Sequence, residues 1–264
     1  MLKIRLIPVL YIKNGLIVRS ENFSYHQNIG NVINEAHRYN EWNVDELIYI
    51  DISRTNDYDL RRDDHKVKSV SNISDIIQNI SKVCFMPLTF GGGIRTVTDV
   101  DIRIKNGADK ITLNHGALEN PNIIKDVALK YGAQCVVVSI DYKVIENVPV
   151  VFSDFGQCNT GINMYDWIKE VESLGAGEIF INSIERDGKA CGYDIETIGS
   201  VVETTNVPVI ACGGAADEFD FIELAQATKV SGIAAGNMFH FTEQSYPRSK
   251  KAMLNNKINV RDAY

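Results

Sequence analysis

The amino-acid sequence predicts a (β/α)8 barrel, because short apolar runs alternate with longer amphipathic stretches along its whole length. About eight such pairs fit into 264 residues, which is the usual size of this barrel. A weak internal repeat supports the same fold, since residues 88–100 and 209–221 both combine a strand, adjacent glycines and the start of a helix. A (β/α)4 half followed by its duplicate would produce such a repeat.

The predicted strands are runs of apolar and β-branched residues, and they cover 4–10, 46–51, 83–90, 109–113, 134–141, 177–183, 207–212 and 231–235. The predicted helices have apolar residues at three- and four-residue spacing, and they cover 31–42, 71–82, 96–106, 121–131, 162–174, 194–205 and 217–227. A doubly wound open sheet is the competing architecture, but no GxGxxG motif of a dinucleotide-binding sheet follows the first strand. We therefore expect one barrel domain over residues 1–264.

Two segments are too long to be simple connections between a strand and a helix. Residues 13–27 have the pattern of a hairpin that extends the first strand, and residues 52–70 are polar and highly charged. Loops that follow the strands of a barrel lie on its catalytic face. Both segments are therefore predicted to cover a substrate.

The composition excludes several classes of protein. The 27 basic and 34 acidic residues give a formal charge of −7, which argues against a general nucleic-acid binder but leaves room for a local phosphate pocket. The five cysteines form no CxxC pair, so neither disulfides nor structural zinc are expected, and a reducing cytoplasm is the predicted location. No segment approaches the roughly 20 apolar residues that span a membrane. The scattered histidines suggest no metal site, and no cofactor is expected.

Two glycine clusters suggest that the protein binds phosphate. Gly91–Gly93 and Gly213–Gly214 each follow a predicted strand and precede a predicted helix, where glycine lets backbone N–H groups approach an anion. One cluster alone would fit an ordinary turn, but two at repeat-related positions favour a ligand with a phosphate at each end. The polar segment 183–189 either helps to hold the second phosphate or forms a solvated turn.

Asp141 is the main candidate for acid–base catalysis. It ends a predicted strand and shares its face with Ser139 and Val137, so an inward-facing Asp141 would lie in the mouth of the barrel. Burial there would raise the pKa of the carboxyl group toward neutrality. The alternative is a structural carboxylate that caps a loop or pairs with a cation. Asp51, at the end of the second strand, is a weaker candidate of the same kind.

Four charged residues occupy the opposite ends of their strands, and these are Arg5, Glu46, Lys110 and Glu178. The alternation of side chains along each strand directs them inward, where charges of both signs can form a ring of ion pairs. Such a ring is either a plug that closes the bottom of the barrel or a feature with a function of its own.

The sequence resembles the cyclase subunit of imidazole glycerol phosphate synthase over most of its length. The segments that carry the resemblance are KIRLIPVL (3–10), VDELIYIDIS (44–53), PLTFGGGIR (87–95), GADKITLN (107–114), GAQCVVVSID (132–141), WIKEVESLGAGEI (167–179), RDGKACGYD (186–194) and AAGNMFHF (234–241). Members of this family are (β/α)8 barrels with a half-barrel repeat, which agrees with the fold predicted above.

The resemblance implies a heterodimer with a glutamine amidotransferase (glutaminase) subunit. In the family that partner docks against the bottom of the barrel, and ammonia passes through the barrel to the active site. The four inward charges match the family's gate for ammonia, which favours the gate over the simple plug. Asp109 and Gln134 match positions near the interface with the glutaminase.

The resemblance also implies two phosphate sites at the top of the barrel, for a phosphorylated small-molecule ligand. In one half the matching residues are Gly92, Gly93 and Asn114. In the other half they are Asp187, Gly188, Gly213, Gly214 and Asn237.

The catalytic residues match the family only in part. Asp141 corresponds to the second catalytic aspartate, but Tyr11 occupies the position of the first. A tyrosine with an ordinary pKa near 10 cannot serve as a base at neutral pH. Other departures at the same end are Arg19, Asn182, Glu185 and Cys212. The residues at the ammonia gate therefore match the family, whereas several residues at the catalytic end of the barrel differ from it.

This asymmetry favours a divergent branch of the family that occurs in bacterial surface-polysaccharide gene sets. The chain would then supply ammonia for the amidination of a surface sugar, with a sugar amidotransferase as a third partner. The first alternative is the cyclase of histidine biosynthesis, which converts ammonia and phosphoribulosyl aminoimidazole-carboxamide ribonucleotide to imidazole glycerol phosphate and AICAR. The second alternative is a conduit that conducts ammonia without catalysis.

Overall fold

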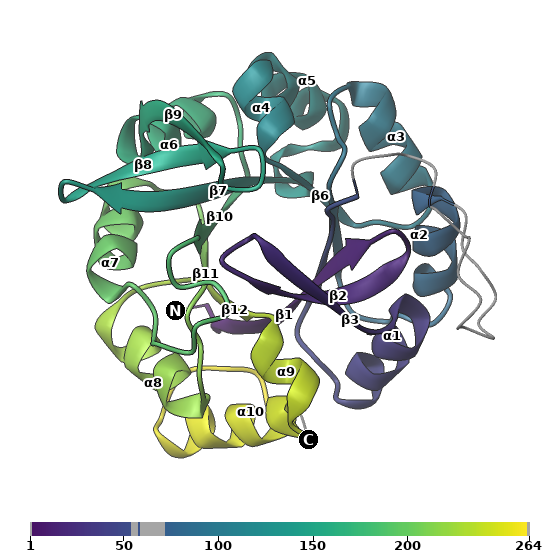
Figure 1. Cartoon of the computed structure of the whole chain (residues 1–264), viewed down its shortest axis with the longest axis vertical. Helices are drawn as coiled ribbons and strands as arrows, with labels where there is room; N and C mark the ends of the chain where they lie inside the picture. The colour runs from purple at the N-terminus through teal and green to yellow at the C-terminus, as the bar shows by residue number, and fades with distance from the viewer. Residues whose placement is uncertain (1, 54–57, 59–71, 263–264) are drawn as a thin grey trace.

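The computed structural model describes residues 2–53, 58 and 72–262. A closed barrel of eight parallel strands forms its centre (Figure 1), and the strands are β1 (Arg5–Lys13), β4 (Leu47–Asp51), β5 (Leu88–Gly91), β6 (Lys110–Leu113), β7 (Val136–Ile145), β10 (Glu178–Ser183), β11 (Val209–Cys212) and β12 (Gly232–Ala235). Each strand pairs with the next in this order, and β12 pairs with β1 to close the ring. The predicted barrel is confirmed, and the open sheet is excluded. The strand β5 is shorter than the predicted run 83–90, because its pairing with β4 begins only at Leu88.

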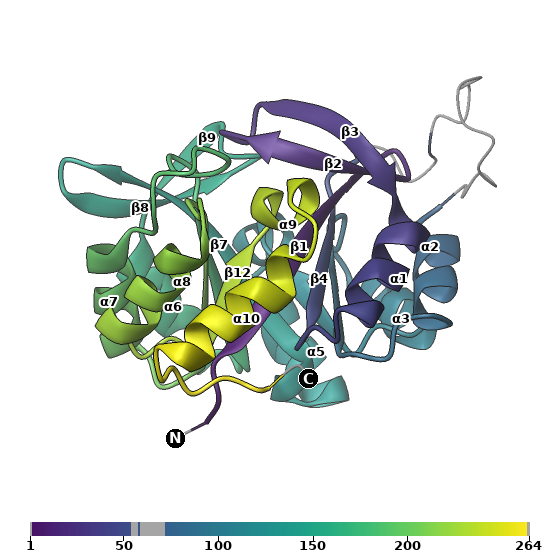
Figure 2. The same cartoon turned by 90° about the horizontal axis from the view of Figure 1, so that it is seen from below.

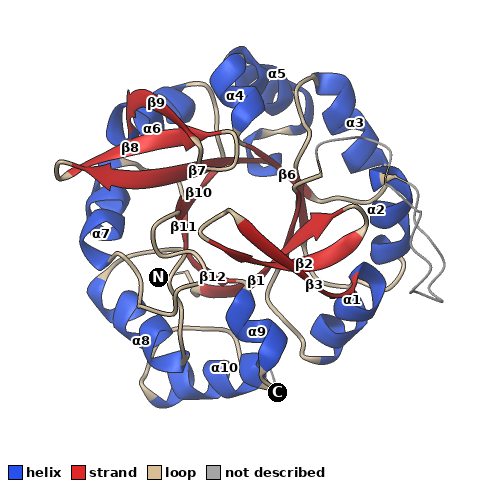
Figure 3. Cartoon of the chain, in the orientation of Figure 1, coloured by secondary structure: helices blue, strands red, loops and turns tan. Residues whose placement is uncertain are grey.

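The predicted helices are confirmed and surround the barrel (Figure 3), and they are α1 (Val32–Glu41), α2 (Ile73–Ser81), α3 (Val97–Lys105), α5 (Asn122–Tyr131), α6 (Met164–Ser173), α7 (Ile195–Thr204) and α8 (Glu218–Ala227). Most begin at a polar residue whose side chain accepts a hydrogen bond from a backbone N–H of the first turn. Asn31 caps α1 in this way, and Thr96 and Asp217 form capping boxes at α3 and α8.

The structure also contains helices that the sequence did not predict. They are α4 (His115–Glu119), the 3-10 turn η1 (Ala133–Cys135), α9 (Asn237–Phe241) and α10 (Ser245–Asn255). The longest of them, α10, was missed because its sequence is polar, although Tyr246, Ser249 and Lys250 are fully or almost fully buried. The ammonium group of Lys250 is 2.7 Å from Asp45, and this ion pair makes its burial tolerable.

Two antiparallel extensions rise from the same end of the barrel (Figure 2). The first is the predicted hairpin, formed by β2 (Leu16–Glu21) and β3 (Tyr25–Asn31) after β1. The second was not predicted and consists of β8 (Val148–Ser153) and β9 (Cys158–Asn163), which pair with the extended end of β7. Of the other predicted cover, residues 52–70, only 52, 53 and 58 belong to the described residues.

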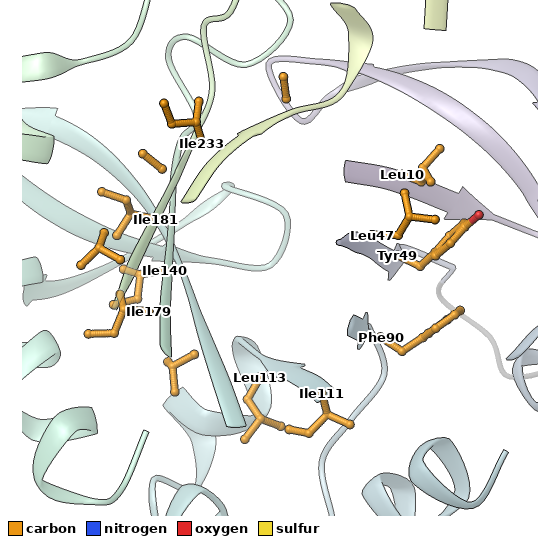
Figure 4. Packing of buried hydrophobic residues seen from close by; sticks show 14 of the residues in the cluster. Leu10, Leu47, Tyr49, Phe90, Ile111, Leu113, Ile140, Ile179, Ile181 and Ile233 are labelled. Carbon is orange, nitrogen blue, oxygen red and sulfur yellow. The ribbon is translucent and has the colours of Figure 1, made fainter. Parts of the chain in front are cut away.

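Two apolar layers lie on the two sides of the barrel wall. The outer layer fills the space between strands and helices (Figure 4), where the rings of Tyr49 and Phe90 stack with centroids 5.5 Å apart. The inner layer fills the barrel, and its members are Ile7, Val9, Tyr11, Val18, Ile48, Val137, Phe180, Ile210, Cys212 and Ala234. Successive residues of a strand point to opposite faces, so Leu6 and Leu10 of β1 belong to the outer layer. Among the described helices, none is both long and apolar enough to cross a membrane.

We predict that Asp45→Asn destabilises the protein by about 3 kcal/mol, because it leaves the buried ammonium of Lys250 without its counter-charge. Asp45 also accepts hydrogen bonds from the backbone N–H of Leu6 and from Arg261, both at 2.8 Å. Its carboxylate therefore joins β1, α10 and the C-terminal segment. Chemical denaturation would measure the loss.

The matched control is Arg248→Gln on the same helix, which breaks an exposed ion pair with Glu218. Its expected cost is below about 1 kcal/mol. Equal losses for the two variants would contradict the structural importance of the Asp45–Lys250 pair.

Candidate active site

A cavity of about 680 Å³ opens at the carboxyl ends of the barrel strands. Its lining includes residues from several strands and from the loops that follow them, among them Tyr11, Ser20, Asp51, Gly92, Gly93, Thr112, Asn114, Ser139, Asp141 and Asn182. Barrel enzymes have their active sites at this end. The cavity is therefore the candidate active site.

Asp141 lies in this cavity, above Ser139 and Val137 on the inner face of β7. The side-chain amide of Asn114 donates a hydrogen bond of 2.8 Å to its Oδ2 atom. Burial raises the pKa of Asp141 to about 7, against the opposing effect of this hydrogen bond and with a contribution from the carboxylate of Asp187. At neutral pH such a carboxyl group can both accept and donate a proton.

Tyr11 lies at the carboxyl end of β1 and belongs both to the inner apolar layer and to the cavity lining. Its hydroxyl group is 3.1 Å from the side-chain nitrogen of Asn182. Burial, together with Cys212 and the nearby carboxyl groups, raises the pKa of Tyr11 well above its ordinary value. Tyr11 therefore stays protonated at neutral pH and can offer a hydrogen bond, but it cannot remove a proton.

The glycine loop of the first half-barrel borders the cavity directly. Gly92 and Gly93 have φ angles of +95° and +62°, in the region that glycine adopts most readily. A Cβ atom at Gly92 would lie 1.9 Å from the carbonyl oxygen of Asp51, so no larger residue fits there. The loop is thus packed against the end of β4 and presents its backbone to the cavity beside Asn114.

The residues assigned to the second phosphate site do not line this cavity, and the β2–β3 hairpin contacts several of them. The Oδ2 atom of Asp187 accepts hydrogen bonds from the Ser20 hydroxyl group at 2.8 Å and from the Phe23 N–H at 3.2 Å. The Asn237 amide donates to the Ser20 carbonyl at 2.7 Å, and a Cβ at Gly188 would lie 2.4 Å from that same oxygen. These contacts were not apparent from the sequence.

The glycines of the second half adopt a backbone conformation that glycine allows, in a close-packed turn. Gly213 and Gly214 have φ angles of +99° and +111°. A Cβ atom at Gly214 would lie 2.0 Å from the carbonyl oxygen of Gly192. Their loop is therefore packed against the loop between β10 and α7.

At the other end of the barrel, four charged side chains form a closed ring of ion pairs. Arg5 contacts Glu46 at 2.6 Å and also contacts Glu178. Lys110 contacts each of the same two carboxylates at 3.0 Å. The hydroxyl group of Thr89 donates a further hydrogen bond of 2.8 Å to Glu46. The inner apolar layer separates this ring from the cavity.

Asp109 and Gln134, the two positions matched to a partner interface, are both exposed and precede β6 and β7 at the ring end of the barrel. Asp109 accepts a hydrogen bond of 2.8 Å from the backbone N–H of Leu88. It borders a surface hollow that also includes Phe85, a side chain that is 83% exposed. In the part of the chain that the structure describes, no group of three His, Cys, Asp or Glu residues is suited to hold a metal ion.

Comparison with known proteins relates the chain to a biosynthetic family. The family model described as "Histidine biosynthesis protein" matches residues 5–245. The chain is 37% identical over 262 residues to the "Imidazole glycerol phosphate synthase subunit HisF" of Streptococcus mutans, which covers 99% of this chain and 100% of that protein. Proteins of the same name from Hydrogenobaculum sp. and Sulfurisphaera tokodaii are 38% and 39% identical, with 99% and 97% of this chain and 100% and 98% of those proteins covered.

We predict that Asp141→Asn stabilises the protein, and more so at pH 8 than at pH 5. A raised pKa means that the folded protein binds the proton more tightly than the unfolded chain does. Ionisation therefore lowers the stability of the native protein increasingly from about pH 4, the ordinary pKa of aspartate, to about pH 7. The neutral amide avoids this cost.

Urea denaturation at the two pH values would measure the effect, which should be larger at pH 8 by about 1–3 kcal/mol. Asp126→Asn is the control, because Asp126 is exposed on α5 and water hydrates its charge. A stability change that is the same at both pH values for Asp141→Asn would show that its carboxyl group is not desolvated.

Proposed function

The chain belongs to the family of the cyclase subunit of imidazole glycerol phosphate synthase, and from this premise we propose that it catalyses the cyclase reaction of histidine biosynthesis. Ammonia and phosphoribulosyl aminoimidazole-carboxamide ribonucleotide would give imidazole glycerol phosphate and AICAR. The relatives are named as one subunit of a synthase, and the partner would be the glutaminase subunit that the family resemblance implies. The observation that carries the proposal is Asp141, a buried carboxyl group in the lining of the cavity whose pKa is raised to about 7.

The comparisons favour this reaction over the sugar amidination that the sequence alone favoured. The relatives named above are subunits of imidazole glycerol phosphate synthase, and each matches nearly the whole of this chain. The amidination of a surface sugar is kept as the second candidate on a single observation, the buried and neutral Tyr11 at the position of a catalytic aspartate.

Asp141 has the properties that the proposed reaction requires of an acid–base group. An ammonia molecule that adds to a carbonyl carbon must lose a proton, and the oxygen that later departs must gain one. A single carboxyl group with a pKa near the working pH can perform both transfers in turn. The hydrogen bond from Asn114 fixes the orientation of the carboxyl group, while Tyr11 contributes a hydrogen-bond donor and no second base.

The ring of charges and the inner apolar layer suit a route for ammonia through the barrel. Arg5, Glu46, Lys110 and Glu178 satisfy each other and close the lower end. Above them the barrel interior is apolar, which disfavours an ammonium ion far more than neutral ammonia. Ammonia that passes the ring would therefore reach Asp141 as the uncharged nucleophile.

The cyclase reaction can be tested with free ammonium at slightly alkaline pH, which removes the need for the glutaminase. We expect imidazole glycerol phosphate to form, and Asp141→Asn to reduce kcat at least about 100-fold because the amide cannot accept or return the proton. Tyr11→Asp should increase turnover, since it supplies a second carboxylate. Tyr11→Phe is the matched control, because it keeps the ring and removes only the hydroxyl group.

Two outcomes would overturn the proposal. If the wild-type protein forms no product and Tyr11→Asp does, the scaffold has kept the site without the reaction, and an amidated sugar becomes the favoured product. If Asp141→Asn retains full turnover, Asp141 is not the acid–base group.

We predict that Arg5→Ala uncouples glutamine hydrolysis in the glutaminase subunit from the cyclase reaction in this chain. Loss of Arg5 leaves Glu46 and Glu178 with only Lys110 as a counter-charge and opens the ring. Glutamine-driven turnover with the glutaminase subunit should fall several-fold relative to glutamine hydrolysis, because ammonia escapes. Ammonium-driven turnover should stay within about twofold, since the active site is at the other end.

Arg248→Ala, at an exposed position on the outer surface, serves as the control for the loss of a cation. Equal losses of glutamine-driven and ammonium-driven turnover in Arg5→Ala would mean that the ring only stabilises the fold.

A further inference from the structure

Arg103 is a buried cation whose role is not explained by the fold. It lies on α3, and only 5% of the residue is exposed. One guanidinium nitrogen, Nη2, donates a hydrogen bond of 2.7 Å to the carbonyl of Gly92, and another, Nη1, donates one of 2.9 Å to the carbonyl of Asp99. The third nitrogen, Nε, is buried and has no hydrogen-bond partner in the described part of the chain.

The charge of this guanidinium group is not neutralised by an ion pair with any described residue. Its two acceptors are neutral carbonyl groups. The carboxylates of Asp51 and Asp99 attract it from a longer distance, but both are engaged elsewhere. Asp51 accepts hydrogen bonds from Ser53 N–H and the Tyr58 hydroxyl group, and Asp99 caps the start of α3.

Burial lowers the pKa of the Arg103 guanidinium group below its ordinary value, although the two carboxylates act in the opposite direction. The effect of burial is therefore larger than the effect of these attractions. Arginine nevertheless remains charged in proteins. A buried positive charge without a counter-ion is unfavourable, so the fold retains a charge that a nearby anion would stabilise.

The position of Arg103 relates it to the glycine loop of the cavity. Nη2 would lie 3.5 Å from a Cβ atom on Gly93, so the guanidinium group is directly behind the loop. Gly92 and Gly93 line the cavity, whereas Arg103 does not. Since the carbonyl and the following N–H of a trans peptide point in opposite directions, the bond from Arg103 to the Gly92 carbonyl directs the Gly93 N–H away from Arg103.

We propose that Arg103 is a positioning residue for an anionic group of the substrate at the Gly92–Gly93 loop. It turns the Gly92 carbonyl away from the ligand, presents the Gly93 N–H to it, and supplies a positive charge from behind the loop. The anion is a phosphate monoester group, whose charge and oxygen acceptors suit a backbone donor with a buried cation beneath it. This inference rests on the proposed function, because it requires a phosphorylated ligand in the cavity.

Arg95 and His26, which line the cavity, do not replace Arg103. Arg95 has a side chain that is 70% exposed and contacts Glu119 at 3.7 Å. Burial and the nearby Lys13 lower the pKa of His26 below its ordinary value, which favours its neutral form at pH 7. Salt screens exposed charges far more than buried ones. Binding that depends on Arg103 should therefore persist at high ionic strength.

The test measures binding of inorganic phosphate by isothermal titration calorimetry, which needs no catalytic activity. Arg103→Leu should raise the Kd for phosphate about tenfold, and Arg103→Lys should restore most of the affinity because it keeps a charge at the same place. Lys105→Gln removes an exposed cation from the same helix and should change the Kd less than about twofold. Circular dichroism would establish that each variant is folded.

A neutral but polar variant separates the charge from the hydrogen bond. If Arg103→Gln binds phosphate as well as the wild-type protein, the charge has no role and the inference is wrong. Equal affinities of Arg103→Leu and wild type would overturn it as well. In the cyclase assay the Arg103→Leu variant should raise KM for the phosphorylated substrate more than it lowers kcat.

The two proposals can fail separately. A wild-type protein that forms no imidazole glycerol phosphate but binds phosphate in an Arg103-dependent way would overturn the proposed function and support this inference. If the wild-type protein has cyclase activity and Arg103→Leu leaves its KM unchanged, the proposed function is supported and this inference is overturned.

Discussion

Successive residues of a β-strand point to opposite faces, and in a closed barrel one of these faces is the interior. This constraint arranges the protein in levels along the barrel axis. On β1, Arg5 belongs to the ring of ion pairs, Ile7 and Val9 to the inner apolar layer, and Tyr11 to the cavity. The alternate residues of the same strand, such as Leu10, pack against the helices. One strand therefore contributes to the closed end, the apolar interior and the chemical end at once.

The two halves of the barrel share a repeat in sequence but differ in what they present. The glycine loop of the first half borders the cavity, with Asn114 beside it. In the second half the β2–β3 hairpin bonds to Asp187 and Asn237 through backbone and side-chain groups. A ligand that reached both halves would have to exchange these contacts for its own. The second half carries an antiparallel extension of its own, β8–β9 after β7, so the halves differ in what their extensions contact.

The cavity and the layer of residues directly behind its glycine loop contain groups that are unfavourable for stability. Asp141 is held at a raised pKa by burial, and Arg103 is buried without an ion-pair partner among the described residues. The continuous apolar core between strands and helices stabilises the fold and offsets the unfavourable free energy of these buried groups. Asp141 could be predicted from its position at the end of an apolar strand. Arg103 could not, because a single arginine within an amphipathic helix normally lies on the solvent face.

The sequence by itself determined the order of the barrel strands and of the main helices between them, the glycine turns and the inward direction of Asp141 and the ring charges. These features depend on a few neighbouring residues, through side-chain alternation, helical spacing and backbone freedom. Tertiary structure alone decided that α10 forms, since Lys250 can be buried only beside Asp45, which lies 205 residues away. It also decided that the hairpin covers Asp187 and that Arg103 lies behind Gly92. Each of these depends on desolvation and on partners distant in the chain, which no local pattern of residues records.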